Sequence, residues 1–156
     1  MAFTDVYGAN YRKAYVAEPR QRIQQGEWGG HVKVLREKFT LDADGAAAET
    51  VLMGKLPKGA MVLSARIFGP DLGGTGTLAL GNAASADGTE AVDVDGFIAS
   101  ADSSGQAFDV SDEDSRGASI GIRRFTKEVD VTLTFTGVTA SATGLIVYAI
   151  LEYIVD

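Results

Sequence analysis

The sequence of 156 residues contains no cysteine, a single histidine and only three prolines. The lack of cysteine excludes disulfide bonds, thiol nucleophiles, iron–sulfur clusters and zinc sites with thiolate ligands. One histidine also excludes metal sites built from several imidazole rings. Few prolines beside 19 glycines favour a chain with many tight turns over one with long linkers.

Basic residues are missing from one long stretch of the chain. Between Ile67 and Ser115 there are ten Asp or Glu residues and no Lys or Arg, and the whole chain carries a net charge of −7. Residues 1–40 have a balance of +3 and residues 41–156 a balance of −10. An acidic body argues against nucleic acid as a partner. It predicts either a solvated face or a surface that accepts the basic N-terminal segment of a neighbouring copy or partner.

Long hydrophobic runs are missing too. The longest covers residues 144–151 and stops at Glu152, well short of the ~18 apolar residues that a membrane-spanning helix needs. Residues 1–5 lack the basic start and apolar run of a secretory signal. We therefore expect a soluble protein that is made in a cytoplasm and has no membrane partner.

Residues 1–27 differ in composition from the rest. They hold three of the five tyrosines and three of the four glutamines, with weak hydrophobic periodicity, so they cannot build a core of their own. Tyrosine rings give large contact area at low entropy cost. The sequence therefore predicts an extended N-terminal arm over 1–27 and a β-sandwich domain over 28–156. The interface candidates in and beside the arm are Tyr7, Tyr11, Arg12, Tyr15, Arg20, Arg22 and Trp28.

The remaining chain has the signature of an all-β fold. Alternating apolar and polar residues are clearest at 129–136, and turn signals separate the segments. About eight or nine antiparallel strands and no helix predict a β-sandwich, with the jelly roll as the commonest eight-stranded arrangement. Seven segments are clear candidates, and three short ones are added to them. The clear candidates are 31–41, 48–56, 60–68, 77–81, 118–125, 128–135 and 145–155, and the short ones are 91–93, 97–99 and 106–110.

The last candidate strand, 145–155, is apolar on both faces. A strand that alternates would leave one face to solvent, so we expect this one to be central in its sheet or covered by another subunit.

Acidic residues form two groups, one at Asp87, Glu90, Asp93 and Asp95 and one at 109–114. Neither matches the ligand register of an EF-hand loop, so solvated loops are favoured and a structural cation is the alternative. The glycines at 73–76 are followed by neither lysine nor helix. The sequence predicts no catalytic, cofactor or metal site, and no enzyme.

A small basic patch lies near the C-terminal third, at Arg123 and Arg124 with Arg116 and Lys127 nearby. It is either a solvated strand end or a contact with an acidic partner surface. We include Arg123 and Arg124 among the interface candidates.

One stretch resembles a known group of proteins. Leu56–Phe68 reads LPKGAMVLSARIF, and Thr77–Gly81 (TLALG) and an Ala/Asp/Gly-rich loop leading to Phe97 follow it. This pattern resembles structural proteins of tailed-bacteriophage virions, in particular head decoration or cement proteins. The resemblance implies a β-sandwich or jelly-roll subunit on the capsid surface, of a kind that is often a homotrimer. There it would bridge major capsid proteins and stabilise the head, with its arm contacting neighbours.

Two alternatives stay open. A tail, neck or head-fibre protein of the same virion would differ in symmetry, since a six- or twelve-fold ring fits the neck or tail and a trimer fits the capsid. A carbohydrate-binding β-sandwich on the virion surface needs exposed aromatic rings, and residues 69–124 contain only Phe97 and Phe108.

Overall fold

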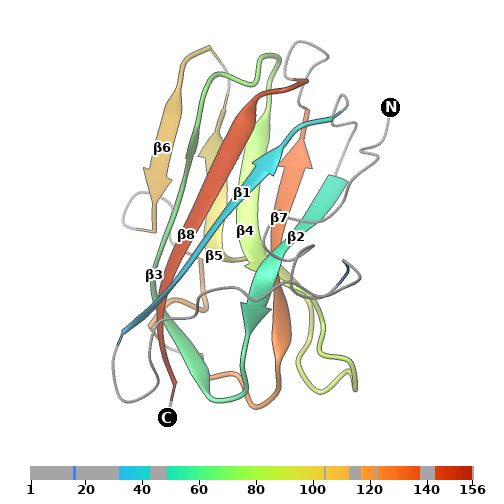
Figure 1. The fold of residues 1–156 in the computed structure, drawn as a ribbon, viewed down its shortest axis with the longest axis vertical. Helices are drawn as coiled ribbons and strands as arrows, with labels where there is room; N and C mark the ends of the chain where they lie inside the picture. The colour runs from blue at the N-terminus through green and yellow to red at the C-terminus, as the bar shows by residue number, and fades with distance from the viewer. Residues whose placement is uncertain are drawn as a thin grey trace.

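The computed structural model describes Val16 and residues 32–42, 49–103, 105–112, 117–121, 123–137 and 143–155. Within these residues it contains eight β-strands (Figure 1). They are β1 (Lys33–Thr40), β2 (Glu49–Leu56), β3 (Ala60–Gly69), β4 (Thr77–Asn82), β5 (Asp93–Asp102), β6 (Phe108–Ser111), β7 (Val129–Thr136) and β8 (Ile146–Val155). No helix among the described residues is long and apolar enough to cross a membrane.

The strands form two sheets of four, in the orders β1-β8-β3-β6 and β2-β7-β4-β5. All neighbouring strands pair antiparallel. Consecutive strands alternate between the two sheets except at the β4–β5 hairpin (Figure 1). This interleaving makes the eight-stranded sandwich a jelly roll, so the predicted fold class is confirmed.

The core lies between the sheets and follows directly from the alternation of the strands. Along β7 the residues Val129, Val131, Leu133 and Phe135 are buried, because side chains at every second position share one face. Phe135 meets Phe39 of the opposite sheet with ring centroids 5.8 Å apart. The two sheets are therefore held together by side chains that the period-two pattern already places inside.

Two strand predictions were wrong in detail. Of the candidate at 91–93 only Asp93 lies in a strand, and this strand, β5, runs on through Gly96 and contains the candidate at 97–99. The candidate at 118–125 is not a strand in its described residues, because 118–121 form a turn and Arg124 makes only an isolated bridge to Met61. Its apolar residues Ile120 and Phe125 are nevertheless buried.

The segment 117–125 instead covers one end of the sandwich and is bonded to both sheets. In the sheet that contains β5, the Ser119 amide donates to the Gly96 carbonyl at 2.8 Å. In the other sheet, the Phe125 amide donates to the Ala60 carbonyl at 2.9 Å. The Phe125 ring also packs edge-on against Phe97, with centroids 6.2 Å apart. A loop that must bury apolar side chains at the end of a core therefore produces a strand-like sequence pattern.

Strand β8 lies between β1 and β3, so the first of the two expected arrangements, a central position in its sheet, is confirmed. Its inward residues Val147, Ala149 and Leu151 are fully buried. Its outward residues are also apolar, and Ile146, Tyr148 and Ile150 are half-buried. The inward residues are apolar because they belong to the core between the sheets. The outward residues give the outer face of this sheet an apolar stripe.

Candidate interaction surfaces

The predicted acidic and basic groups meet at the end of the sandwich, where the loop 83–92 faces the segment 117–127. Glu90 is the centre of the contact and is only 7% exposed. Its carboxylate accepts hydrogen bonds from the backbone amide and the hydroxyl of Thr126, both at 2.6 Å. It also accepts one from the guanidinium of Arg123 at 2.8 Å. We call this arrangement of Glu90, Arg123 and Thr126 the loop clamp.

The loop clamp fixes the charge state of Glu90. The hydrogen bonds from Thr126, and then the bond from Arg123, lower the pKa of Glu90 from 4.5 to about 2, although its burial acts in the opposite direction. Donors that bind the ionised form favour it over the neutral acid. Glu90 therefore stays charged far into the acid range while the protein is folded.

Further contacts extend the clamp on both sides. Asp87 pairs with Lys127 at 2.7 Å and accepts a hydrogen bond from the Ser85 hydroxyl at 2.8 Å. The bond from Lys127 is the main reason why the pKa of Asp87 lies below its usual value. Asp93 lies 3.7 Å from the second terminal nitrogen of Arg123. The loop 83–92 is thus joined to the following loop by a network of opposite charges.

These contacts show where the two predicted charge groups lie. Arg123 and Lys127 from the basic patch bind Asp87, Glu90 and Asp93 from the first acidic group. Among the residues that the structure describes, no group of three or more His, Asp or Glu side chains is placed to hold a metal ion. At this end of the sandwich, acidic side chains of one segment and basic side chains of the other therefore neutralise each other's charge.

Of the two arginines proposed as interface residues, Arg123 is held inside the loop clamp and its guanidinium lies 4.9 Å from the centre of the Phe125 ring. Arg124 donates to the Gly59 carbonyl at 2.9 Å. Their role at an interface stays a prediction. The other candidates, Tyr7, Tyr11, Arg12, Tyr15, Arg20, Arg22 and Trp28, lie outside the described residues.

A second surface, the outer face of the β1-β8-β3-β6 sheet, carries an ordered stack of side chains. Phe68 on β3 and Tyr148 on β8 are nearly parallel, with ring centroids 5.0 Å apart. Arg36 lies 5.8 Å from the centre of the Tyr148 ring, and Arg66 lies 5.7 Å from that of Phe68. Cations over aromatic faces are attracted by the ring quadrupole. The stack therefore spans three strands in a fixed arrangement.

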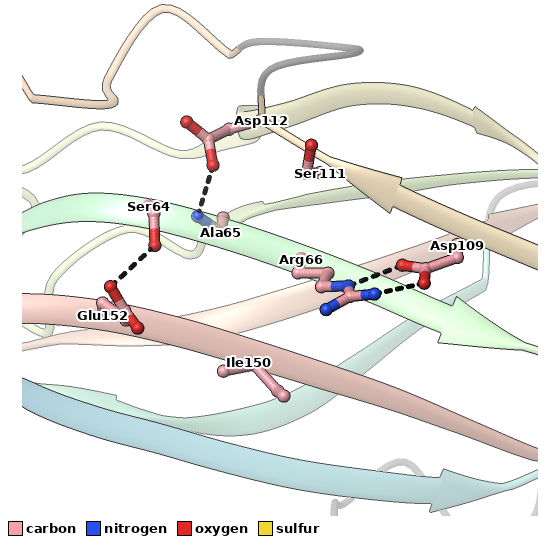
Figure 2. Close-up of a pocket in the computed structure, with 8 residues that line it drawn as sticks. All are labelled: Ser64, Ala65, Arg66, Asp109, Ser111, Asp112, Ile150 and Glu152. Carbon is pink, nitrogen blue, oxygen red and sulfur yellow. Dashed lines mark hydrogen bonds and ion pairs between the residues drawn. The ribbon is translucent and has the colours of Figure 1, made fainter.

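A depression of about 560 Å³ lies beside this stack, over β8, β3 and β6 (Figure 2). Its polar groups bind one another: Arg66 forms a two-pronged ion pair with Asp109, and the Ser64 hydroxyl donates to Glu152 at 3.2 Å. Asp112 accepts from the Ala65 amide at 2.9 Å. The lining residues are Ser64, Ala65, Arg66, Asp109, Ser111, Asp112, Ile150 and Glu152. Because these polar groups are paired with one another, the depression is a shallow surface of polar and apolar side chains that is suited to contact with another surface.

Solved structures contain the same fold. A chain in the structure described as the capsid of Ralstonia phage GP4 superposes with a TM-score of 0.68 and 19% sequence identity, over 87% of this chain and 92% of that chain. The jelly roll is shared with chains of phage capsid structures. A second such chain, from the capsid asymmetric unit of cyanophage Pam1, gives a TM-score of 0.58 and 18% identity over 91% and 99% of the two chains. No protein-family model matches the chain, and no curated protein matches its sequence.

The sandwich shared with these phage capsid chains includes features that the sequence reasoning missed. The stack of Phe68 and Tyr148 joins residues 80 positions apart, and the loop clamp joins Glu90 to a residue 33 positions away. The one available signal for the stack was the apolar outward face of the last strand. For the clamp, the signal was the presence of a group of acidic residues in one segment and a group of basic residues in another.

Proposed function

We propose that the chain is a non-enzymatic structural protein of a phage virion. The observation that carries the proposal is the shared jelly roll: it extends over nearly the whole of this chain and of two chains from phage capsids. Because about nine-tenths or more of each chain is covered, those capsid chains are about as long as this one. The polar side chains of both surfaces described above bind one another, which suits a structural part better than a reaction centre.

Within the virion, the proposed role is that of a head decoration or cement subunit. It would sit on the capsid surface as a homotrimer and bridge major capsid proteins, as the resemblance of residues 50–100 implies. The apolar stripe and aromatic stack on the outer face of the β1-β8-β3-β6 sheet support contact with a partner, since Tyr and Arg are enriched where interfaces derive most of their energy.

The direct test is binding to phage heads. The full chain, mixed with heads of the encoding phage that lack this protein, should cosediment with them at saturating stoichiometry and raise the temperature at which the heads rupture. Recovery on tails or necks and not on heads would favour the tail, neck or head-fibre alternative. Binding to a glycan array without binding to heads would favour the carbohydrate-binding alternative.

Deletion of residues 1–27 is expected to leave a folded domain that binds heads at least tenfold more weakly. An arm that becomes ordered on binding costs about 1–2 kcal/mol per residue in backbone entropy, so its contacts must be extensive to be useful. Cosedimentation measures the loss, and the far-ultraviolet circular dichroism and thermal unfolding of the truncated chain serve as controls. A truncated chain that binds heads with full affinity would contradict a role of the arm.

A further inference from the structure

The loop that joins β4 to β5, residues 83–92, uses its polar groups to hold its own shape. The Ser85 amide donates to the Glu90 carbonyl at 3.0 Å, and the Glu90 amide donates to the Ser85 hydroxyl oxygen at 2.9 Å. Asn82, which is fully buried at the base of the loop, donates from its side-chain amide to the Ala91 carbonyl at 3.0 Å. The loop therefore has a defined shape before any partner binds, and little ordering cost would be added on binding.

The outward side chains of this loop and of the start of β5 are mostly apolar. Val92 and Val94 are 60% and 45% exposed, and three alanines beside them are exposed as well. In Figure 1 the loop, coloured yellow-green, extends away from β4 and β5 at the lower right. The next exposed residue, Asp95, is charged and marks the border of this surface. We call the five residues the apolar tip: Ala84, Ala86, Ala91, Val92 and Val94. Single exposed valines need no explanation, but an apolar group on a pre-formed loop indicates a contact surface.

The charges next to the apolar tip are largely neutralised within the chain. Asp87 pairs with Lys127, and Glu90 and Asp93 share Arg123. These three acids and two bases leave one net negative charge where the loop would otherwise carry three, whereas the whole chain carries −7. Copies of a strongly acidic protein repel one another wherever like charges meet. The surface around the tip is thus one where two copies can approach with little repulsion.

We propose that copies of this chain associate through the apolar tip, with the tips of neighbouring copies in contact around a common rotation axis. Near such an axis each residue lies close to the same residue of the other copies, so the surface there has to be complementary to itself. Valine and alanine side chains meet this condition because each can pack on its own kind, whereas an unpaired carboxylate would be repelled by its counterpart. The loop clamp then serves assembly as well as stability, because it neutralises carboxylates that would otherwise face one another.

A second copy is favoured over a different protein because of where the polar groups of the loop are bound. Polar and charged groups specify a different partner and its orientation, and those of Ser85, Asp87 and Glu90 bind within the chain. The inference rests on the proposed function in that it specifies the contact within the proposed homotrimer. It does not depend on binding to heads. A chain that associates through the tip and fails to bind heads would keep this inference and remove the cement role, and a chain that binds heads as a monomer would do the reverse.

The test measures the mass of the full chain in solution by light scattering, in which one copy accounts for 16.3 kDa. In Val92→Asp the association constant should fall roughly tenfold or more, because apolar contact is lost and like charges meet. Lys127→Ala should weaken association roughly tenfold at about 20 mM salt and recover it at about 0.5 M, because salt screens the repulsion between Asp87 carboxylates. Lys127 is 48% exposed, so this variant keeps the test valid if Val92→Asp does not fold.

Two variants away from the tip are the matched controls. Thr136→Asp introduces the same charge as Val92→Asp, but at an exposed position at the other end of β7 from Asp130, whose carbonyl binds the first residue of the loop. Lys38→Ala removes the same charge as Lys127→Ala, but from an exposed position on β1. Both controls should keep the unmodified mass at both salt concentrations, and thermal unfolding shows that each variant is folded.

Several results would overturn the proposal. A full chain that is monomeric at its highest soluble concentration would do so, as would a folded Val92→Asp variant that keeps the unmodified mass. If Lys127→Ala stays weakened at high salt, its effect is not repulsion between copies, and the contact near Asp87 is wrong. An equal loss of association in Thr136→Asp or Lys38→Ala would place the interface elsewhere.

Discussion

Replacing Gly117 by alanine is expected to lower the free energy of unfolding by roughly 3 kcal/mol, as overpacking without room to relax does. A Cβ atom at this position would lie 2.2 Å from the backbone carbonyl carbon and oxygen of Gly96. Neither backbone can move freely, because the Gly117 amide donates to the Phe97 carbonyl at 2.9 Å. The added methyl group must therefore push the covering segment away from β5.

Urea unfolding and a thermal scan measure this effect. For a chain of this length, the expected loss corresponds to a fall of roughly 10 °C in Tm. Gly144→Ala is the matched control, because a Cβ there meets nothing within 4 Å and only the positive φ of 85° opposes it; that strain costs roughly 1–2 kcal/mol. Equal losses in the two variants would mean that the close approach of Gly117 and Gly96 does not limit the fold.

Replacing Glu90 by alanine is expected to cost roughly 3 kcal/mol of stability at pH 7, because removing one member of a largely buried ionic network leaves the others unsatisfied. The Thr126 amide and hydroxyl and the Arg123 guanidinium would all lose their acceptor. Asp87→Ala is the matched control in the same loop: its side chain is 46% exposed, so a much smaller loss is expected. Similar losses in both variants would show that the burial of Glu90 adds nothing.

Glu90 also makes the free energy of unfolding depend on pH. In the unfolded chain Glu90 takes up a proton near its ordinary pKa of 4.5, whereas in the folded chain it does so only near 2. The unfolded state therefore binds more protons between these values, and its contribution, about 3 kcal/mol, is present above pH 5 and disappears as the pH falls towards 2. In Glu90→Gln this share of the pH dependence should be missing.

Urea unfolding of the unmodified chain and of Glu90→Gln, from pH 7 to pH 2.5, measures the difference. Asp87 and Asp109 also have lowered pKa values, so both proteins should lose stability in acid, and the unmodified chain should lose more. Two parallel curves would contradict the assignment to Glu90.

The strands were predictable because their cause is local. In β7 and β3, apolar and polar residues alternate, and this alternation places the apolar side chains on the buried face. The same pattern therefore predicts both the strand and its inward residues. The same logic misread 118–125, where Ile120 and Phe125 are buried by a covering loop and not by a sheet. The residues around Gly96 were misread in the opposite direction: they were divided between two short candidate strands, but β5 runs through Gly96, where a Cβ atom would lie 2.6 Å from a carboxylate oxygen of Asp93.

For the candidate surfaces, the sequence predicted some of the participating residues but not the contacts between them. The sequence marked Glu90 and Arg123 as members of an acidic and a basic group, but their pairing depends on two loops that the fold brings to one end of the sandwich. Likewise, the apolar outward face of β8 was visible, whereas its partner Phe68 on β3 depends on the strand order. Contacts between distant segments follow from topology, which no local pattern specifies.

The pairing of the first described strand with the last has a kinetic consequence. Lys33 of β1 lies opposite Tyr153 of β8, so the sheet that contains both cannot form until nearly the whole chain has left the ribosome. Proteins dominated by such distant pairings fold slowly. Until the last strand is available, the unpaired strand edges of the incomplete chain favour aggregation. A growing chain therefore cannot present this sheet in its folded form, and assembly would begin only with finished subunits.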